Sequence, residues 1–393
     1  MTQGGAARLR RYAYPGLCYV TASRLPEMRN FKTHASDWYQ TDAQSRLTLD
    51  KETPMRSLRL LALLLSLTTP AVCRAQAALG KDVEVRFATV KEAQRILTDR
   101  DDFVRSMSPF DRAARLKTDK DVSETEYLAF VSNEVLEWSD AERRKITAAF
   151  QVLATRFQAF GLPFPKPVFL VKTTGNEEGQ SAYTRANAVV LPRTFLRSSE
   201  TSLQETICHE LFHVLSRANP KLRDDLYATI GFLKCEDVEF PPSLKTRKIT
   251  NPDAPRNDHY IRIQVNGKAA CGIPLLFSKE EKYNTARGGE FFEQLQFQLL
   301  LVEPAANSPA VEPISEGQHP KLVALDQASG FMEQVGRNTG YLIHPEEILA
   351  DNFMMMILSK RNARSPEIIE RLERILKQKP TAQPIPQRVS AEE

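Results

Sequence analysis

The chain has 393 residues, of which 42% are hydrophobic and 26% are charged, and its formal net charge is +4. This length suits one large domain or two ordinary ones, and the composition is that of a soluble globular protein. The small net charge and the lack of a long basic stripe argue against a nucleic-acid partner. Five cysteines are too few for a disulfide scaffold.

An apolar segment at 55–77 has the pattern of a secretory signal peptide. Arg56 and Arg59 precede an apolar run that is too short to span a bilayer comfortably. Ala75-Gln76-Ala77 then matches an A-x-A cleavage site. We therefore expect a secreted or periplasmic protein with no stable membrane insertion after cleavage. A buried helix is the alternative interpretation of this segment.

Residues 1–54 precede the predicted signal peptide, although signal peptides begin at the N-terminus. These residues are polar and mixed in charge, without a clear periodicity. We expect Met55 to be the true start, with residues 1–54 a non-native or disordered extension. The alternative is a real disordered extension ahead of a signal anchor.

Three cysteines, Cys208, Cys235 and Cys271, remain after cleavage. An oxidising compartment would permit a disulfide between Cys235 and Cys271. Cys208 lies in a helical pattern and is expected to pack as a small buried thiol. The sequence leaves open whether Cys235 and Cys271 pair.

The first part of the remaining chain, to about residue 161, is mainly helical in pattern. Ser139 and Glu142 form a capping box at the start of one helix, and Gly161 follows its end. Short β-branched and aromatic runs come next. They predict strands at 168–171, 181–184 and 188–191.

A further helix follows these strands. Ser202 and Glu205 form a capping box at its predicted start, and Asn219-Pro220 sets its end. Apolar residues recur between these limits at helical spacing, at Leu203, Ile207, Leu211, Val214 and Leu215. Helices and short strands together predict an α+β fold.

Residues 236–330 have the character of an insertion. Asn266-Gly267 predicts a β-hairpin, the runs at 239–258 and 307–320 predict loops, and the run at 289–303 fits either a strand or a buried helix. Helices are predicted from Pro345 and from Pro366. We expect a single domain at 78–380 and a disordered tail at 381–393.

The helix predicted at 202–218 contains the motif H-E-x-x-H. His209 and His213 are four residues apart, so both imidazoles lie on one helix face and can bind one metal ion. Glu210 lies beside them and can accept a proton from a metal-bound water. Catalytic zinc needs three protein ligands and an open position, so a third ligand must come from elsewhere.

Two pairs of acidic residues can supply that ligand. Asp224 and Asp225 follow the motif closely in the sequence. Glu347 and Asp351 are four apart on the helix predicted from Pro345, and the small Ala350 would let that helix approach the motif helix. Glu346 and His344 are adjacent alternatives, but only Glu347 is followed by an aspartate four residues later.

HELFH at 209–213 and EILAD at 347–351 resemble the two motifs of the gluzincins, the thermolysin-like clan of zinc metallopeptidases. The resemblance covers only these motifs. It implies that Glu347 binds zinc with the two histidines and that Asp351 orients His209. It also implies a zincin-like α+β fold, with a small mixed sheet, an active-site helix carrying H-E-x-x-H and a second helix carrying E-x-x-x-D.

The function implied is hydrolysis of peptide bonds by a zinc-bound water, with Glu210 as the general base. The strand segment at 181–191 would pair with an extended peptide substrate. Possible donors to the oxyanion are Tyr183, His319, Tyr341 and His344.

Two other functions stay open at this point. One is a non-catalytic zinc-binding or chaperone-like protein on a zincin scaffold, although such a site does not need a base beside the metal. The other is a protein of the export pathway in which the motif is accidental.

Overall fold

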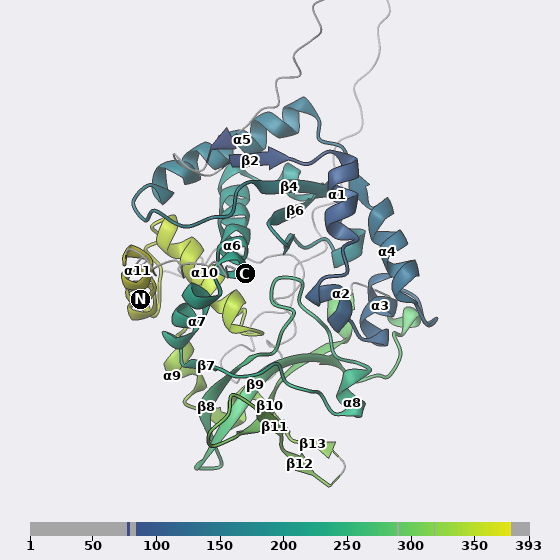
Figure 1. Cartoon of the computed structure of the whole chain (residues 1–393), viewed down its shortest axis with the longest axis vertical. Coiled ribbons are helices and arrows are strands. Elements are labelled where there is room, and N and C mark those ends of the chain that lie inside the picture. Colours follow the sequence, from purple (N-terminus) through teal and green to yellow (C-terminus); the bar gives the residue numbers. More distant parts are fainter. Residues whose placement is uncertain (1–76, 79–83, 289–290, 318, 379–393) are drawn as a thin grey trace, which may run out of the picture.

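The described part of the chain contains a mixed β-sheet, an antiparallel β-sheet, a small hairpin and several helices (Figure 1). The computed structural model describes residues 77–78, 84–288, 291–317 and 319–378. The predicted extension at 1–54, the predicted tail at 381–393 and, apart from Ala77, the predicted signal peptide lie outside these residues. Within them, no helix is both long and apolar enough to cross a membrane. The predicted α+β class is confirmed.

The first sheet has the strand order β1-β2-β4-β6-β5, and β3 also pairs with β4. β2, β4 and β6 run parallel, whereas β5 pairs antiparallel with β6 and ends the order. β5 is therefore an antiparallel edge strand. The strands are β1 (Ala77–Ala78), β2 (Glu84–Phe87), β3 (Val135–Leu136), β4 (Val168–Thr173), β5 (Tyr183–Arg185) and β6 (Ala188–Pro192).

The strands predicted at 168–171 and 188–191 are confirmed as β4 and β6. The strand predicted at 181–184 begins two residues later, at Tyr183. The reason is a short 3-10 helix, η2 (Asn176–Glu178), whose last carbonyl accepts a hydrogen bond from the Ser181 N–H at 3.0 Å. This bond holds Ser181 in the turn.

The helices of the N-terminal part lie between β2 and β4 in the sequence and share one hydrophobic core with the first sheet. The predicted helix with the Ser139–Glu142 capping box is confirmed as α5, and its apolar face is buried as its spacing predicts. The helices of this N-terminal part are α1 (Val90–Leu97), α2 (Asp102–Ser106), α3 (Pro109–Arg115), α4 (Glu124–Asn133) and α5 (Asp140–Phe157).

The second sheet is built almost entirely from the predicted insertion. Its order is β11-β10-β9-β8-β15, with β14 on β10 and β7 on β8, and every pair is antiparallel. The strands are β7 (Phe232–Lys234), β8 (His259–Val265), β9 (Lys268–Ser278), β10 (Leu295–Pro304), β11 (Val311–Pro313), β14 (Leu322–Val323) and β15 (Ala328–Ser329).

The hairpin predicted at Asn266-Gly267 is confirmed: both residues have positive φ, and β8 pairs with β9 across them. The ambiguous run at 289–303 contains the 3-10 helix η5 (Phe291–Gln294) and all of β10 except its last residue, Pro304. The prediction of a plain loop at 307–320 is wrong, because this stretch contains β11 and the hairpin of β12 (Ser315–Glu316) and β13 (His319–Pro320). Short strands interrupted by Gly and Pro carry little periodicity in the sequence.

The remaining helices follow the first sheet or flank the second. They are η3 (Phe195–Arg197), α6 (Glu200–Ala218), α7 (Pro220–Ala228), α8 (Pro242–Lys245), η4 (Thr285–Arg287), η6 (Leu325–Gln327), α9 (Phe331–Val335), α10 (Pro345–Ile357) and α11 (Pro366–Lys377). The helices predicted from Pro345 and Pro366 are confirmed, each with proline in its first turn.

The three cysteines of the described residues carry free thiols. Cys208 is buried in α6, as predicted. Cys235 and Cys271 both border the small hydrophobic cluster of the second sheet but form no disulfide. The pairing that the sequence left open is therefore absent from this structure.

Candidate metal centre

The helix α6 carries the H-E-x-x-H motif and is almost entirely buried. Its N-cap is Ser199, whose side chain accepts a hydrogen bond from the Ser202 N–H at 3.2 Å, so the predicted capping box of Ser202 with Glu205 is wrong. Glu205 instead forms an ion pair with Lys360. The helix ends at Ala218, as predicted.

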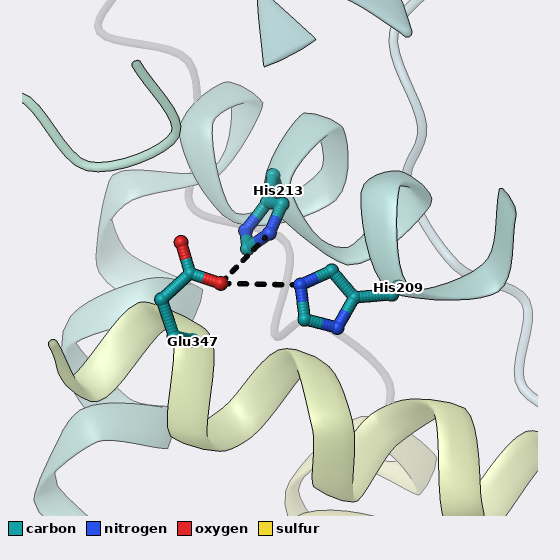
Figure 2. Close-up of side chains that lie close together, drawn as sticks. All are labelled: His209, His213 and Glu347. Atoms are coloured by element: carbon teal, nitrogen blue, oxygen red, sulfur yellow. Dashed lines mark hydrogen bonds and ion pairs between the residues drawn. The ribbon is translucent and has the colours of Figure 1, made fainter. Parts of the chain in front are cut away.

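His209 and His213 of α6 converge with Glu347 of α10 (Figure 2). Glu347 Oε2 lies 3.1 Å from His209 Nε2 and 3.6 Å from His213 Nε2. Two ligands of a tetrahedral zinc ion, with bonds of about 2.05 Å, are about 3.3 Å apart. Both distances from Glu347 are close to this value, and the three ligand atoms all lie within 4.8 Å of one another.

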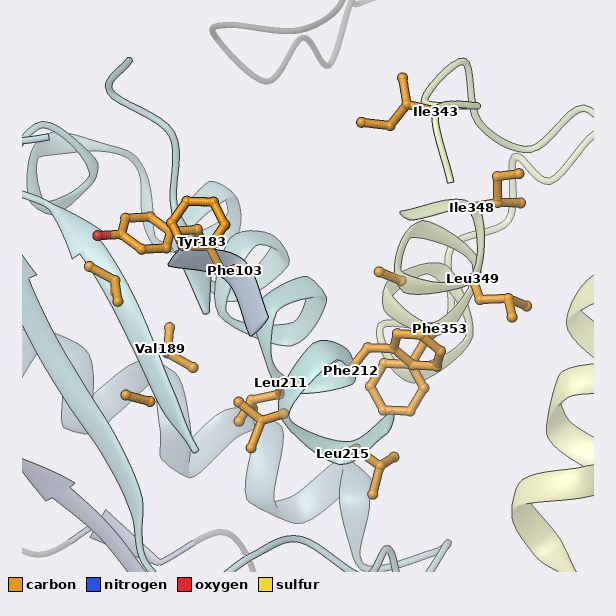
Figure 3. Packing of buried hydrophobic residues seen from close by; sticks show 14 of the residues in the cluster. Phe103, Tyr183, Val189, Leu211, Phe212, Leu215, Ile343, Ile348, Leu349 and Phe353 are labelled. Atoms are coloured by element: carbon orange, nitrogen blue, oxygen red, sulfur yellow. The ribbon is translucent and has the colours of Figure 1, made fainter. Parts of the chain in front are cut away.

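Close packing of α6 against α10 places these residues together (Figure 3). The rings of Phe212 and Phe353 lie 5.4 Å apart between the helices, and Leu349 and Ala350 are fully buried. Ala350 has only a methyl side chain, so it adds little bulk at the face that meets α6. The packing that fixes the candidate ligands is therefore the hydrophobic core itself.

Two buried atoms of the motif have no hydrogen-bond partner among the described residues. They are His213 Nε2 and Glu210 Oε2. A buried polar atom without a partner is costly, and native proteins avoid it unless an ion, water or ligand fills the place. Three further buried atoms of the described residues have no partner, but these two belong to one motif, which fits a centre that holds a metal ion with a reacting water beside it.

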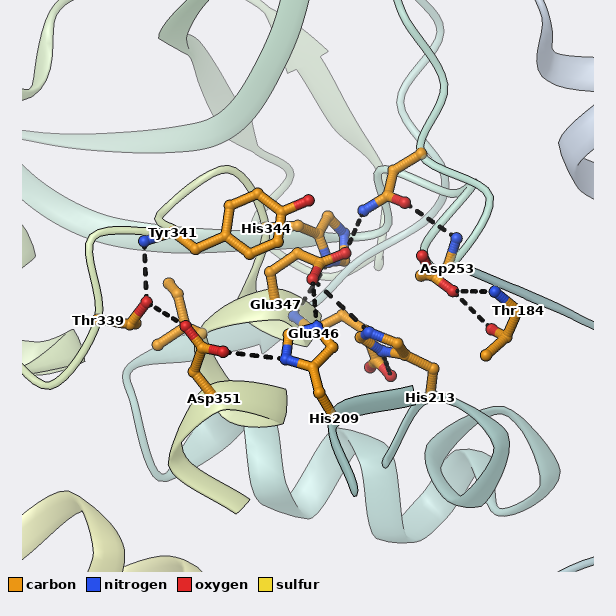
Figure 4. A network of polar contacts seen from close by, with 12 residues as sticks. Thr184, His209, His213, Asp253, Thr339, Tyr341, His344, Glu346, Glu347 and Asp351 are labelled. Atoms are coloured by element: carbon orange, nitrogen blue, oxygen red, sulfur yellow. Dashed lines mark hydrogen bonds and ion pairs between the residues drawn. The ribbon is translucent and has the colours of Figure 1, made fainter. Parts of the chain in front are cut away.

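A carboxylate supports each histidine from the side away from the centre (Figure 4). Asp351 Oδ1 lies 2.9 Å from His209 Nδ1, and Thr339 donates a hydrogen bond to Asp351. Such a carboxylate fixes the tautomer of a metal-binding histidine and leaves Nε2 free to bind. This is the contact expected of Asp351.

Glu346 supports His213 in the same way, which the sequence did not predict. Its Oε1 lies 3.0 Å from His213 Nδ1, and the hydroxyls of Ser216 and Tyr227 donate hydrogen bonds to its carboxylate. All four side chains are buried. Glu346 is thus on the far side of His213 from Glu347 and does not compete with it as a ligand.

The charges of the cluster favour a cation at its centre. Burial acts to lower the pKa of His213, but the carboxylates around it, led by Asp253 and Glu347, raise it to about 9. Burial acts to raise the pKa of Glu347, but His213 and His209 lower it to about 2. Protonated histidines supply the positive charge here, and a metal ion would replace their protons.

Glu210 has a different environment from Glu347. Burial, reinforced by the nearby Asp253 carboxylate, raises the pKa of Glu210 to about 8. A carboxyl group whose pKa lies near neutrality can both accept and return a proton at physiological pH. This matches the expected role of Glu210 as a general base.

The other candidate ligands do not join the centre. Asp224 pairs with Arg223 and lies 3.3 Å from His259 Nε2, and Asp225 forms an exposed ion pair with Lys221. His344 is the N-cap of α10, where its Nδ1 accepts a hydrogen bond from the Glu346 N–H at 3.1 Å.

Of the four possible oxyanion donors, Tyr341 lies at the centre. Its ring stacks on His209 with 6.4 Å between the ring centroids, and it lines the cleft. His344 faces the Arg256 carbonyl, His319 is exposed on β13, and the Tyr183 hydroxyl donates to Glu177 at 3.3 Å.

A cleft of about 570 Å³ opens over the centre, and His209, Glu210 and Glu347 line it. Its wall includes a group of apolar side chains and a group of cationic side chains. The apolar group includes Phe195, Met354 and Met355, and the cationic group is Lys360 and Arg361.

Comparison with known protein families, curated proteins and solved structures finds no match for this chain.

Proposed function

We propose that the protein is a secreted or periplasmic zinc metallopeptidase with a zincin-like catalytic domain. The observation that carries this proposal is the convergence of His209 Nε2, His213 Nε2 and Glu347 Oε2 beside a buried Glu210 whose Oε2 has no partner among the described residues. Two imidazoles and one carboxylate, with one position left open, form a ligand set typical of catalytic zinc.

The roles of the side chains follow from their positions. Zinc held by this set would act as a Lewis acid on the scissile carbonyl and lower the pKa of a reacting water. Glu210 would take a proton from that water and deliver it to the leaving amine. Burial raises the pKa of Tyr341 well above its usual value, so its hydroxyl stays protonated and can donate a hydrogen bond to the developing oxyanion.

A peptide substrate is supported by the cleft and by the neighbouring edge strand. β5 is the antiparallel edge of the first sheet, and Ser181 and Ala182, just before it, line the cleft. The residues of β5 itself are buried, so an extended peptide would pair with the backbone just before it and place side chains against the cleft wall. The predicted signal peptide supports the proposed location outside the cytoplasm.

The alternative is a non-catalytic zinc-binding or chaperone-like protein. Against it stands Glu210, which is 3% exposed and whose Oε2 has no partner among the described residues. Burying a carboxylate without a partner is costly, and a purely structural zinc site has no use for one. The peptidase is the proposal that gives this residue a role.

A chelation experiment tests the proposal. The mature protein, incubated with a mixture of unblocked peptides, is expected to release fragments that mass spectrometry detects. Pretreatment with a zinc chelator should abolish release, and added Zn²⁺ should restore it, because the proposed mechanism needs the metal. Hydrolysis that continues unchanged in the stripped protein would contradict the proposal.

Replacing Glu346 with glutamine is expected to weaken zinc binding by roughly 10- to 100-fold, the usual cost of losing an outer support of a metal-binding histidine. Competition with a chromophoric chelator measures the affinity. Glu367→Gln is the matched control, because Glu367 is exposed in the first turn of α11, directly after a proline as Glu346 is in α10. Equal affinities for the two variants would show that Glu346 does not position His213.

A further inference from the structure

The segment at 250–256, here called the dividing segment, lies against the metal centre. Asn251 Nδ2 donates a hydrogen bond to Glu347 Oε1 at 2.5 Å. Arg217 donates to the carbonyls of Pro252 and Asp253 at 3.1 and 3.0 Å. The segment is also tied to α3, since Asp111 Oδ2 accepts a hydrogen bond from the Thr250 N–H at 2.9 Å. These bonds give it a fixed position.

Asp253 closes the outer edge of β5. Thr184 lies between Tyr183, which is opposite Val190 of β6, and Arg185, which is opposite Ala188. The Thr184 N–H does not bond to β6. It donates a hydrogen bond to Asp253 Oδ1 at 2.7 Å. The outward backbone position of Thr184 is therefore occupied. A peptide strand can pair with the edge at 181–182 but cannot continue past Thr184 while the segment is in place.

The same residue separates two cavities. Asp253 lines both the metal cleft of about 570 Å³ and a second cavity of about 430 Å³ on the other side of the dividing segment. Pro252 and Ala254 line the second cavity but not the metal cleft. Asp253 therefore marks the end of the metal cleft that faces the second cavity, and it lies directly beside the centre: ligand atoms of Asp253, Glu210 and His213 lie within 4.8 Å of one another.

Asp253 brings a carboxylate to this end of the cleft. No hydrogen bond or ion pair with the described residues reaches Asp253 Oδ2, and the Glu210 carboxyl group is nearby. The neighbouring Arg217 has its guanidinium bonded to backbone carbonyls and lines the second cavity instead. His213 also lies beside Asp253, and it would give up its proton on binding the metal ion. The cations of the metal cleft, Lys360 and Arg361, belong to the segment that follows α10.

We propose that the protein is an aminopeptidase, in which Asp253 binds the free α-amino group of the substrate at the closed end of the cleft. The proposal rests on the peptidase function proposed above. An ammonium group suits this end, whereas a C-terminal carboxylate would be repelled by the Asp253 carboxylate.

The short distance from Asp253 to the centre sets the length of the product. The α-nitrogen and the carbonyl carbon of one residue are about 2.5 Å apart, so an amine held by Asp253 leaves room for a single residue before the scissile bond. Water oxygen adds to the carbonyl carbon of that residue, and the bond from this carbon to the next nitrogen breaks. Glu210 carries the proton to that nitrogen, releasing one amino acid and a peptide with a new amino terminus.

Matched peptides test this assignment. The zinc-loaded wild type receives one peptide sequence in three forms: unblocked, N-acetylated and C-amidated. Mass spectrometry is expected to show sequential loss of N-terminal residues from the unblocked and amidated forms. Cleavage of the acetylated form should be lower by roughly 10- to 100-fold, the cost of losing a charged hydrogen bond. Internal cleavage of the acetylated peptide at a comparable rate would overturn the assignment without affecting the zinc peptidase proposal.

Asp253→Asn isolates the carboxylate. Asparagine keeps the Oδ1 acceptor for Thr184 but loses the charge, so kcat/KM for the unblocked peptide is expected to fall by roughly 10- to 100-fold. Zinc content should stay that of the wild type. Asp225→Asn, in an exposed ion pair with Lys221, is the control and should match the wild type. Unchanged kcat/KM in Asp253→Asn would contradict the assignment.

Binding provides a measurement that does not need turnover. Calorimetry with the Glu210→Gln variant should show tighter binding of the unblocked peptide than of the acetylated peptide, and Asp253→Asn in the same background should remove the difference. Equal binding of the two peptides by Glu210→Gln would refute recognition of the amine. This comparison decides the assignment even if no peptide in the set is hydrolysed.

Discussion

Glu210→Gln is expected to lower kcat/KM for peptide hydrolysis by about 10²- to 10⁴-fold, the usual contribution of a general acid–base group. Glutamine has nearly the same shape as glutamate, but its amide cannot accept a proton from water. Since Glu210 is not one of the three converging ligands, zinc content should stay that of the wild type. Steady-state kinetics and elemental analysis on the same preparation measure the two effects.

Glu200→Gln is the control for this experiment, because Glu200 lies exposed in the first turn of the same helix. It should retain both zinc and activity. The comparison also separates the two zinc-binding functions. If Glu210→Gln loses no activity in any assay of the protein, the glutamate has no catalytic role and the non-catalytic alternative is favoured.

The residues at the core of the candidate site could be predicted from the sequence because they obey a local rule. His209 and His213 are one helical turn apart, as are Glu347 and Asp351, so each pair shares a helix face whatever the rest of the fold does. Apolar residues at helical spacing then predict that both helices are buried. The structure confirms both helices and brings the two faces together.

Glu346 and Asp253 could not be assigned in the same way. Glu346 is adjacent to Glu347, and the sequence does not say which histidine nitrogen each carboxylate faces. Only the packing of α6 and α7 beside α10 decides which carboxylate faces which nitrogen. Asp253 lies in a polar, Pro-rich stretch and meets Thr184 across 69 residues. No spacing rule describes such a contact, because it depends on where the second sheet places the dividing segment.

The start of α6 shows a different limit. Ser199 and Ser202 both lie at the beginning of the apolar pattern, and only Ser202 has a glutamate three residues later. The capping-box rule therefore favours Ser202. In the structure the helix begins one turn earlier, where the Ser199 side chain accepts a hydrogen bond from the Ser202 N–H. Glu205 pairs with Lys360 instead of capping the helix, a tertiary contact that the sequence does not reveal.

Glu347→Ala is expected to reduce zinc affinity by more than the roughly 10- to 100-fold that follows loss of an outer support. The substitution removes one of three direct ligands and leaves His209 and His213 without the carboxylate that lies 3.1 and 3.6 Å from their Nε2 atoms. Two histidines alone do not complete the ligand set of a catalytic zinc site. Competition titrations of the variant and the wild type measure the loss.

Zinc stoichiometry, determined by elemental analysis of the folded mature protein beside Glu347→Ala, tests the central claim most directly. One zinc per chain in the wild type and a sharp loss in the variant are the predicted result. Equal zinc in both proteins would place the third ligand elsewhere. A folded wild type that takes up no zinc, even after incubation with the metal, would contradict the metal centre and with it the proposed function.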